Sequence, residues 1–193
     1  MTPSDPRPVG RVLERKVLAS SGRFDFVEVT EELPNGVTEP RSWVAHPGAA
    51  CIVPVLADGR LVLIHQYRST LGRWILEFPA GTLEAGEDPA LTAGRELEEE
   101  SGYRAGKLDR MFEIHPAPGV TDELIVVYLA TELELREQSL DPGECLEVVR
   151  YSPDELKELW QRGELIDGKT VAALGYLWAF PTTLPAVSPE PAS

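Results

Sequence analysis

The stretch GTLEAGEDPALTAGRELEEESGY, residues 81–103, decides the fold of this chain. Asp88 can accept hydrogen bonds from the first N–H groups of a helix, and Pro89 suits the first helical position because no N–H is needed there. Gly102 can end the helix, since glycine readily adopts the left-handed conformation of a helix cap. These signals predict a helix between Pro89 and Gly102.

Three glutamates gather on one side of this predicted helix. Glu96 lies three residues before Glu99 and four before Glu100, so their carboxylates project together and repel one another by about 0.2–0.5 kcal/mol per pair. Leu91, Gly94 and Leu97 share one face at helical spacing, and Leu97, flanked by Ala93 and Gly94, is expected to turn the opposite side of the helix inward. A carboxylate stripe on a helix that packs through its other face suits a hard cation such as Mg²⁺. Taken alone, the same residues are also typical of a solvated acidic helix.

The rest of the chain predicts strands on both sides of this helix and two further helices. Pro34-Asn35-Gly36 is a turn signal between strand-like segments, as in a hairpin. Ser152 and Glu155 form a capping-box pattern at a helix start. Strands are expected within residues 11–45 and at 49–56, 61–68, 74–81, 108–115 and 124–133, and helices near 153–162 and 169–179. This irregular alternation predicts a mixed α/β layer fold.

Length and charge narrow the class of protein. The chain has 193 residues, which suits one domain with a small appendage, and its formal net charge is −14. Nucleic acid and anionic membranes would repel such a chain, so neither is expected as a partner. A phosphate-containing substrate would therefore require metal ions or local arginines.

Cysteine use and the chain ends bear on location. Cys51 and Cys145 are too distant in sequence to indicate a metal cluster or a disulfide framework, which favours a reducing cytoplasm. The first residues, MTPSDPRPVG, show no signal-peptide pattern, and no apolar run reaches the roughly 18 residues of a membrane helix. Residues 181–193 are proline-rich and are expected to form a disordered tail.

The whole of residues 81–103 resembles the Nudix box. That motif is a glycine, five residues, a glutamate, seven residues, then Arg-Glu-aliphatic-any-Glu-Glu-any-Gly-aliphatic. The matching positions are Gly81, Glu87, Arg95, Glu96, Leu97, Glu99, Glu100 and Gly102. Tyr103 stands where an aliphatic residue is usual, a departure that affects packing rather than chemistry.

The resemblance implies a Nudix-type α/β/α sandwich with a mixed sheet, plus a small N-terminal antiparallel β region. The implied division is a β region over residues 1–45 that serves dimerisation and the adenosine site, a Nudix hydrolase domain over 46–180, and the tail over 181–193. It also implies a homodimeric enzyme rather than a nucleotide-sensing module. A sensor can lose the acidic residues, whereas this chain retains them.

The resemblance assigns metal-binding and catalytic roles to the helix. Glu96 and Glu100 match principal Mg²⁺ ligands, Glu99 matches a further ligand or a residue that positions water, and the backbone carbonyl of Ala80 matches another ligand. Two or three Mg²⁺ ions, for which Mn²⁺ can substitute, would neutralise the diphosphate, orient a water and stabilise the leaving phosphate.

Other box residues are expected to be structural. The guanidinium of Arg95 can hold a box carboxylate bidentately, and Glu87 is the expected partner. Direct ligation of the metal by Glu87 is the alternative. Gly81 and Gly102 are also expected to have structural roles.

Downstream of the box, EIHPAPGVTDELIVVYLA resembles the ADP-ribose pyrophosphatase branch of the family. Pro118 lies fifteen residues beyond the box, at the spacing of that branch. Glu123 is implied as the general base, with Asp122 as a weaker candidate. A plain proline-rich turn and an exposed loop acid are the alternatives.

The same branch suggests substrate contacts before the box. Arg68 ends a strand and is expected to reach the diphosphate or the terminal ribose. Arg41 and Trp43 are expected near the adenosine, and Glu77 near the ribose or the metal. An exposed arginine and a core tryptophan are the alternatives for Arg68 and Trp43.

Residues 163–170, GELIDGKT, formally match a phosphate-binding P-loop. A P-loop should follow a strand, whereas this stretch follows a predicted helix, so Gly163 is expected to end that helix. Glu164 and Asp167 would also repel phosphates. Lys169 is instead expected to open the last helix.

The sequence therefore predicts Mg²⁺-dependent hydrolysis of ADP-ribose to AMP and ribose 5-phosphate. Hydrolysis of FAD or of another nucleoside diphosphate derivative, such as an ADP-sugar, is the alternative.

Overall fold

The computed structural model describes residues 7–180. These residues form two compact units, each of which is described by itself. Unit 1 combines the chain up to Pro47 with Ala117–Glu123, and unit 2 combines Gly48–Pro116 with the chain from Leu124 onward. The predicted disordered tail at 181–193 lies outside the described residues.

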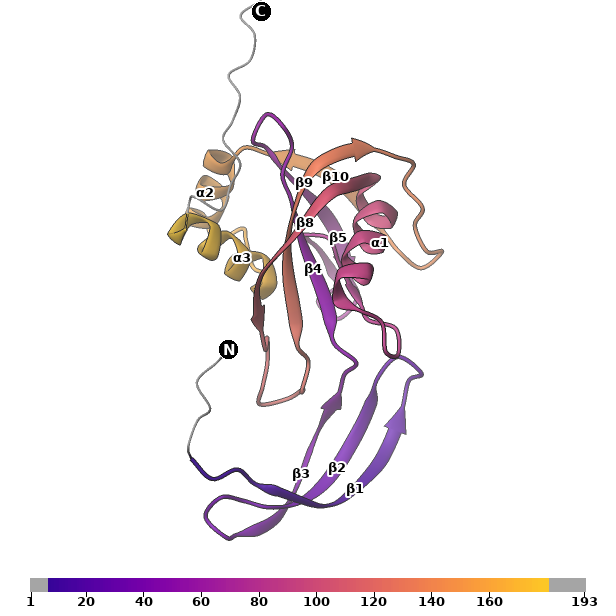
Figure 1. Cartoon of the computed structure of the whole chain (residues 1–193), viewed down its shortest axis with the longest axis vertical. Helices are drawn as coiled ribbons and strands as arrows, with labels where there is room; N and C mark the ends of the chain where they lie inside the picture. The colour runs from indigo at the N-terminus through magenta and orange to yellow at the C-terminus, as the bar shows by residue number, and fades with distance from the viewer. Residues whose placement is uncertain (1–6, 181–193) are drawn as a thin grey trace, which may run out of the picture. The chain divides into compact units, whose positions relative to one another are not determined.

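Unit 1 is a three-stranded antiparallel sheet in the order β1-β2-β3 (Figure 1). Its strands are β1 (Arg11–Ser20), β2 (Asp25–Glu32) and β3 (Thr38–Ala45). The hairpin predicted at Pro34–Gly36 joins β2 to β3, and Gly36 adopts a φ of 81° that favours glycine. Val27 and Val29 of β2 are buried, whereas every residue of β1 is exposed.

The segment 117–123 runs beside β3, which explains why it belongs to unit 1. The amide of Val44 donates to the carbonyl oxygen of Val120 at 2.9 Å, and the amide of Asp122 donates to the carbonyl oxygen of Val44 at 3.3 Å. Val44 and Thr121 form an isolated parallel bridge. The proline-rich loop expected near the substrate is therefore attached to the N-terminal sheet.

Unit 2 contains two sheets. The four-stranded sheet has the order β7-β4-β9-β8 and is mixed, because β4 and β9 are parallel while its other pairs are antiparallel. The three-stranded sheet has the order β10-β5-β6 and is antiparallel. The strands are β4 (Ala49–Pro54), β5 (Leu61–Arg68), β6 (Arg73–Glu77), β7 (Ala80–Thr82), β8 (Tyr103–Ile114), β9 (Ile125–Leu135) and β10 (Leu146–Tyr151).

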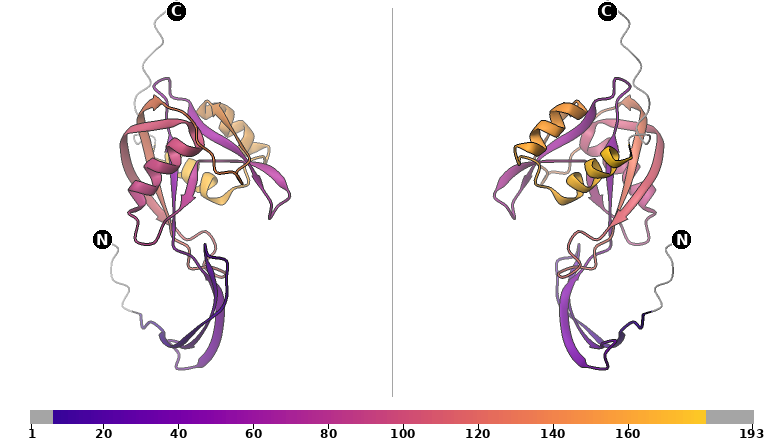
Figure 2. Two further views of the ribbon diagram at one scale, coloured as in Figure 1. Left: turned by 90° about the vertical axis from the view of Figure 1, so that its right-hand side faces the viewer. Right: turned by 90° about the vertical axis from the view of Figure 1, so that its left-hand side faces the viewer.

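Helices cover the sheets of unit 2 from opposite sides, as Figures 1 and 2 show. They are α1 (Pro89–Ser101), α2 (Pro153–Gln161) and α3 (Gly168–Ala179). Side chains alternate along the central strand β4, since Ala49, Cys51 and Val53 join the core cluster beneath α2 and α3 while Ala50 and Ile52 join the cluster beneath α1. The predicted α/β/α sandwich with a mixed sheet is confirmed.

Helix α1 forms with the predicted caps. The Asp88 carboxylate accepts from the Ala90 amide at 2.8 Å, and Gly102 ends α1 with a φ of 68°. Leu97 is fully buried, but the prediction for Leu91 is wrong, because its side chain is 67% exposed. Ala93 is buried in the same cluster as Leu97, as expected from the sequence.

The strand predicted at 74–81 is divided. β6 ends at Glu77 and β7 begins at Ala80, and the two belong to different sheets. Pro79 has no N–H to continue a ladder, and its carbonyl oxygen accepts from the Ile52 amide at 2.9 Å instead. β10 was not predicted.

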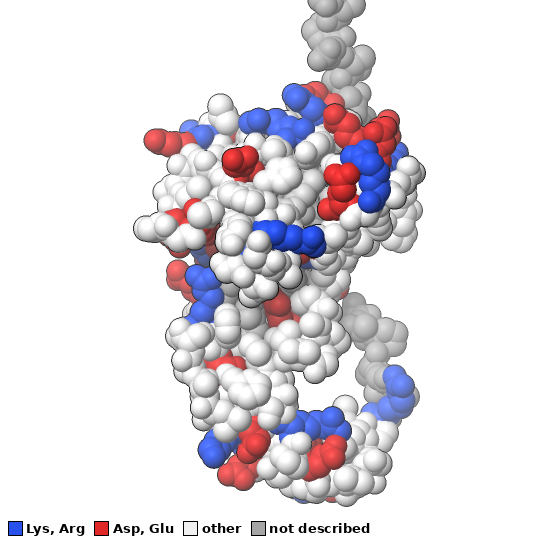
Figure 3. Space-filling view, turned by 180° about the vertical axis from the view of Figure 1, so that it is seen from behind, with Lys and Arg blue, Asp and Glu red and all other residues white. Residues whose placement is uncertain are grey.

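The surface carries both signs of charge. Figure 3 shows Lys and Arg side chains interspersed with Asp and Glu on one face. Within residues 7–180, no helix has the length and apolar character needed to cross a membrane.

Candidate active site

The Glu96 carboxylate lies directly against the backbone of Gly81. A Cβ atom on Gly81 would lie 2.0 Å from both Cδ and Oε1 of Glu96. Gly81 has no positive φ, so glycine is needed here for space rather than for backbone conformation. The glycine that begins the box therefore makes room for a carboxylate of α1, and the Glu96 side chain is only 12% exposed.

Glu100 is the most deeply buried acid of the box. It is 4% exposed, and its Oε2 accepts from the Ala80 amide at 2.9 Å. Burial and, to a smaller extent, the charge of Glu96 raise the pKa of Glu100 to about 8, although the hydrogen bond from the Ala80 amide opposes this shift. A buried carboxyl group in this state is stabilised by a proton or by a bound cation.

Arg95 contacts three box carboxylates at once. Its Nη1 donates to Glu96 Oε1 at 2.7 Å and to Glu99 Oε2 at 3.0 Å, and its Nη2 donates to Glu87 Oε2 at 3.4 Å. Glu87 thus contacts Arg95 through one nitrogen, whereas a bidentate pair was expected. Among the described residues, Arg95 Nε is buried without a hydrogen-bond partner.

The box acids fit a divalent cation in chemistry but are not gathered into a ready-made site. In the part of the chain that the structure describes, no three Asp, Glu, His or Cys side chains are arranged to hold a metal. Glu96 and Glu99 contact Arg95, while Glu100 faces Ala80. Burial raises the pKa of Glu96 as well as that of Glu100, although the charge of Arg95 lowers that of Glu96. Oxygen donors in such a setting are those that Mg²⁺ prefers.

Glu144 adds negative charge to this site from outside the box. The charge of Glu144 also raises the pKa of both Glu96 and Glu100, although burial has a larger effect on each. Its Oε2 accepts from the Asp141 amide at 3.0 Å, which fixes it in the segment before β10. Sequence reasoning missed Glu144, because nothing in its local sequence distinguishes it from other surface acids.

Glu77 is the buried centre of a chain of ion pairs. Arg68 donates from Nε and Nη2 to its two oxygens, each at 2.6 Å. Lys169 also contacts Glu77, and its Nζ lies 3.0 Å from Asp167 Oδ2. Burial raises the pKa of Glu77, but hydrogen bonds from Arg68 and the charge of Lys169 outweigh it, so the pKa is lowered overall. Glu77 is 1% exposed, which leaves little of its carboxylate for a substrate.

In unit 1, Asp122 ties the 117–123 segment to β3. Its carboxylate accepts from Trp43 Nε1 at 3.2 Å and from the His46 amide at 2.8 Å. Trp43 is half-buried. The carboxylate of Asp122 is therefore engaged in structural hydrogen bonds.

The remaining predicted site residues of unit 1 differ in their exposure. Glu123 is partly buried, with its Oε1 3.8 Å from His46 Nδ1. Arg41 is exposed and pairs with Glu39, and Pro118 is exposed.

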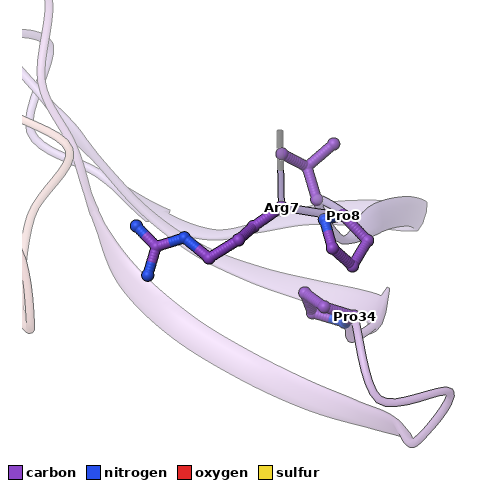
Figure 4. Close-up of a pocket in the computed structure, with 4 residues that line it drawn as sticks. Arg7, Pro8 and Pro34 are labelled. Carbon is purple, nitrogen blue, oxygen red and sulfur yellow. The ribbon is translucent and has the colours of Figure 1, made fainter. Parts of the chain in front are cut away.

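Two surface hollows contain none of the predicted site residues. One, of about 450 Å³, lies in unit 1, where Pro8 and Pro34 face each other and the Arg7 guanidinium points away (Figure 4). The other, of about 370 Å³, lies in unit 2 and is lined by His65, Arg73, Trp74, Ile75, Leu76, Tyr151, Leu159, Gly163, Glu164 and Ile166.

Comparison with known proteins identifies the family. The NUDIX domain model matches residues 45–174, more than half of the chain. The chain belongs to the Nudix hydrolase family. The ADP-ribose pyrophosphatase of Bacillus subtilis (strain 168) is 40% identical over 172 residues, which cover 86% of this chain and 93% of that protein. The methanol dehydrogenase activator of Bacillus methanolicus is 38% identical over 176 residues, which cover 88% of this chain and 95% of that protein.

A solved structure also resembles this Nudix chain. It is described as an ADP compounds hydrolase, has 26% sequence identity and a TM-score of 0.78, and the match covers 93% of this chain and 98% of that one. The predicted family and fold are confirmed, including the N-terminal antiparallel sheet. The prediction of a Nudix-type enzyme is confirmed as well.

The P-loop-like stretch of this Nudix chain has a different role from phosphate binding. α3 begins at Gly168 with Asp167 as its cap, and Gly163 follows α2 with a φ of 73°, as expected from the sequence. Sequence reasoning nevertheless missed that Lys169 and Thr170 point back to the segment before the box. The three-residue spacing from Asp167 to Thr170 is a helix-start signal, but it does not reveal these distant contacts.

Proposed function

We propose that this protein hydrolyses the diphosphate bond of ADP-ribose, giving AMP and ribose 5-phosphate. The observation that carries the proposal is the box itself, in which the largely buried side chains of Glu96 and Glu100 lie beside Gly81 and Ala80 with raised pKa values. Similarity to an ADP-ribose pyrophosphatase over 86% of the chain supports this substrate.

In this proposal, Glu96, Glu99, Glu100 and the carbonyl of Ala80 hold Mg²⁺. The bound ion supplies positive charge that neutralises the diphosphate oxygens and eases attack by water. The chain's own residues fix the geometry. Gly81 leaves room for Glu96, and the amide of Ala80 orients Glu100. Arg95 pairs with Glu96 and Glu99 until a cation competes for them.

Two acids are candidates for the general base. Glu123 is the one that the family resemblance suggests, and it lies in unit 1 near His46. Glu144 is favoured by a specific observation, because its charge acts on Glu96 and Glu100 within the same unit. We expect Glu144→Gln to lower kcat by about 10²–10⁴ and Glu123→Gln to act mainly on KM. The reverse pattern in steady-state kinetics would assign the base to Glu123.

For substrate binding, Arg68 is the proposed contact to the diphosphate or ribose. Glu77 accepts two hydrogen bonds from Arg68, so its proposed role is to orient Arg68 rather than to contact the substrate. Trp43, Arg41 and Pro118 are proposed to form the adenosine side, supported by their place in the N-terminal sheet and its attached loop.

The test is incubation of the full chain with ADP-ribose and Mg²⁺, followed by chromatography of the products. AMP should appear, EDTA should abolish its formation, and Glu100→Gln should lower the rate by orders of magnitude. A parallel panel of FAD, NADH and ADP-sugars tests the alternative, which the solved ADP compounds hydrolase supports in general terms. Failure to turn over any nucleoside diphosphate derivative would defeat the proposal.

We also propose that the protein is a homodimer joined through its N-terminal sheet. β1 is an edge strand with ten exposed residues, among them Val12, Leu13, Val17 and Leu18. Exposed apolar edge strands tend to be covered by a partner. Light scattering should give a dimer mass at micromolar concentration, and Val17→Lys should shift it towards monomer. A monomer mass for the unmodified protein would contradict the proposal.

A cytoplasmic location stays a prediction, supported by the free thiols of Cys51 and Cys145.

A further inference from the structure

The segment Glu77–Ala80, which leads into the box, is held by hydrogen bonds at successive residues. The Phe78 amide donates to Thr170 Oγ1 at 2.8 Å, and the Pro79 carbonyl oxygen accepts from the Ile52 amide at 2.9 Å. The Ala80 amide then donates to Glu100, as described above. The position of the proposed metal-binding carbonyl therefore depends on contacts made over the two preceding residues.

Of the residues that hold this segment, Thr170 is the furthest from the box in sequence. It is fully buried, and its hydroxyl uses both of its functions, since it donates to Asp167 Oδ2 at 2.7 Å and accepts from Phe78. Phe78 is itself fully buried, so no solvent can replace that hydrogen bond. The hydroxyl thus joins the first turn of α3 to the chain two residues before Ala80.

Lys169 also links the first turn of α3 to the segment that leads into the box. It contacts Glu77 and Asp167 while its side chain is only 10% exposed. Asp167 in turn caps α3 by accepting from the Thr170 amide at 3.0 Å. Glu77 and Phe78 are therefore both attached to residues of one helical turn.

We propose that the first turn of α3, Asp167–Thr170, is a positioning element of the metal centre, with Thr170 as its positioning residue. Its hydroxyl fixes Phe78 and so sets the carbonyl of Ala80 and the Glu100 carboxylate that the Ala80 amide holds. Metal ligands must lie within about 0.2 Å of their ideal distances, and loss of a supporting hydrogen bond typically lowers metal affinity about 10–100-fold. The inference rests on the proposed metal-dependent function.

The test compares three variants of the full chain. Thr170→Val keeps the shape but removes the hydroxyl, and Thr170→Ser restores the hydroxyl. Leu177→Val, in the buried core at the far end of α3, is the control for a general loss of helix packing. Mn²⁺ binding is measured directly by electron paramagnetic resonance, alongside the Mg²⁺ concentration for half-maximal hydrolysis of ADP-ribose and the Tm.

We expect Thr170→Val to weaken Mn²⁺ binding about tenfold and to raise the half-saturating Mg²⁺ concentration similarly. Thr170→Ser should stay within about twofold of the unmodified protein, and Leu177→Val should lower the Tm without changing Mn²⁺ affinity. If Thr170→Val does not fold, Thr170→Ala takes its place, since it also removes the hydroxyl, and the same tenfold loss of Mn²⁺ binding is expected.

The direct binding measurement separates this inference from the proposed function. Unchanged Mn²⁺ affinity in Thr170→Val, or an equal loss in Leu177→Val, overturns the positioning role. Absence of Mn²⁺ binding by the unmodified protein overturns it as well. A tenfold loss of Mn²⁺ binding in a protein that hydrolyses no nucleoside diphosphate derivative supports the positioning role and defeats only the proposed reaction.

Discussion

Replacing Gly81 by alanine should disable the site while leaving the fold nearly intact. The added Cβ would lie 2.0 Å from Glu96 Cδ and Oε1 and 2.4 Å from Glu96 Cγ. Carbon contacts are normally about 3.5–4.0 Å, so the carboxylate must move by about 1.5 Å. All three atoms belong to the outer part of a flexible side chain, which can turn aside.

The expected losses differ for activity and stability. A catalytic group misplaced by about 1 Å costs about 10² in rate, or about 2.7 kcal/mol of transition-state stabilisation. Turning the Glu96 side chain out of its preferred rotamer costs about 0.5–1.5 kcal/mol. For a chain of this size that corresponds to a fall in Tm of roughly 1–6 °C. Activity should therefore fall much further than stability.

Gly94→Ala is the matched control. A Cβ on Gly94 would meet only Leu108 Cδ1 at 3.8 Å, an ordinary contact, and alanine favours the helix by up to about 1 kcal/mol. Its Tm should stay the same or rise, with unchanged hydrolysis of ADP-ribose and unchanged Mn²⁺ binding. Near-normal kcat and Mn²⁺ affinity in Gly81→Ala would refute the reasoning, because Glu96 would then not need its present position.

Three further predictions follow from individual contacts. In metal-free protein the pKa of Glu100, about 8 when folded against a usual 4.5, makes the folded state retain a proton that the unfolded chain releases. Its contribution to stability is therefore lost as pH rises from about 4.5 to 8, and thermal melts in EDTA should show a smaller loss over that window for Glu100→Gln. Asp122→Ala removes the acceptor for Trp43 and His46, so limited proteolysis should cut the 117–123 segment faster, with a higher KM for ADP-ribose. Ser152→Ala breaks the capping box of α2 and should cost about 1 kcal/mol, seen as a fall in Tm of about 2–4 °C with unchanged kcat.

The features predicted correctly from the sequence are those that local chemistry decides. The caps of α1 and α2 are specified within four residues, and the hairpin at Pro34–Gly36 is specified by its own turn residues. The burial of Leu91 could not be decided locally, because helical spacing alone does not say how wide the covered face is. Ala93, next to Leu97 on the covered face, packs against the sheet, whereas Leu91 does not.

The features that were missed depend on pairs of residues far apart in the sequence. Lys169 and Glu77 are 92 residues apart, as are Thr170 and Phe78, and no periodic pattern connects them. The P-loop match at 163–170 was rejected for the right reason, yet its lysine and threonine are buried contacts rather than surface residues. Residues 163–170 do not form a P-loop, but two of them contact the segment that leads into the box.

Under the proposed function, the contacts of the cations near the box account for the need for a bound metal when a diphosphate enters. Arg95 contacts Glu87, Glu96 and Glu99, while Arg68 and Lys169 both contact Glu77. Each of these positive charges is thus already offset by at least one carboxylate, and the chain as a whole carries −14. A doubly charged ion held by the box acids would reverse the sign of the field at the place where the substrate's own negative charge must be accommodated. The affinity for ADP-ribose should therefore depend more steeply on the Mg²⁺ concentration than on ionic strength. If ADP-ribose binds with equal affinity in EDTA, the arginines and Lys169 suffice for binding without a metal ion.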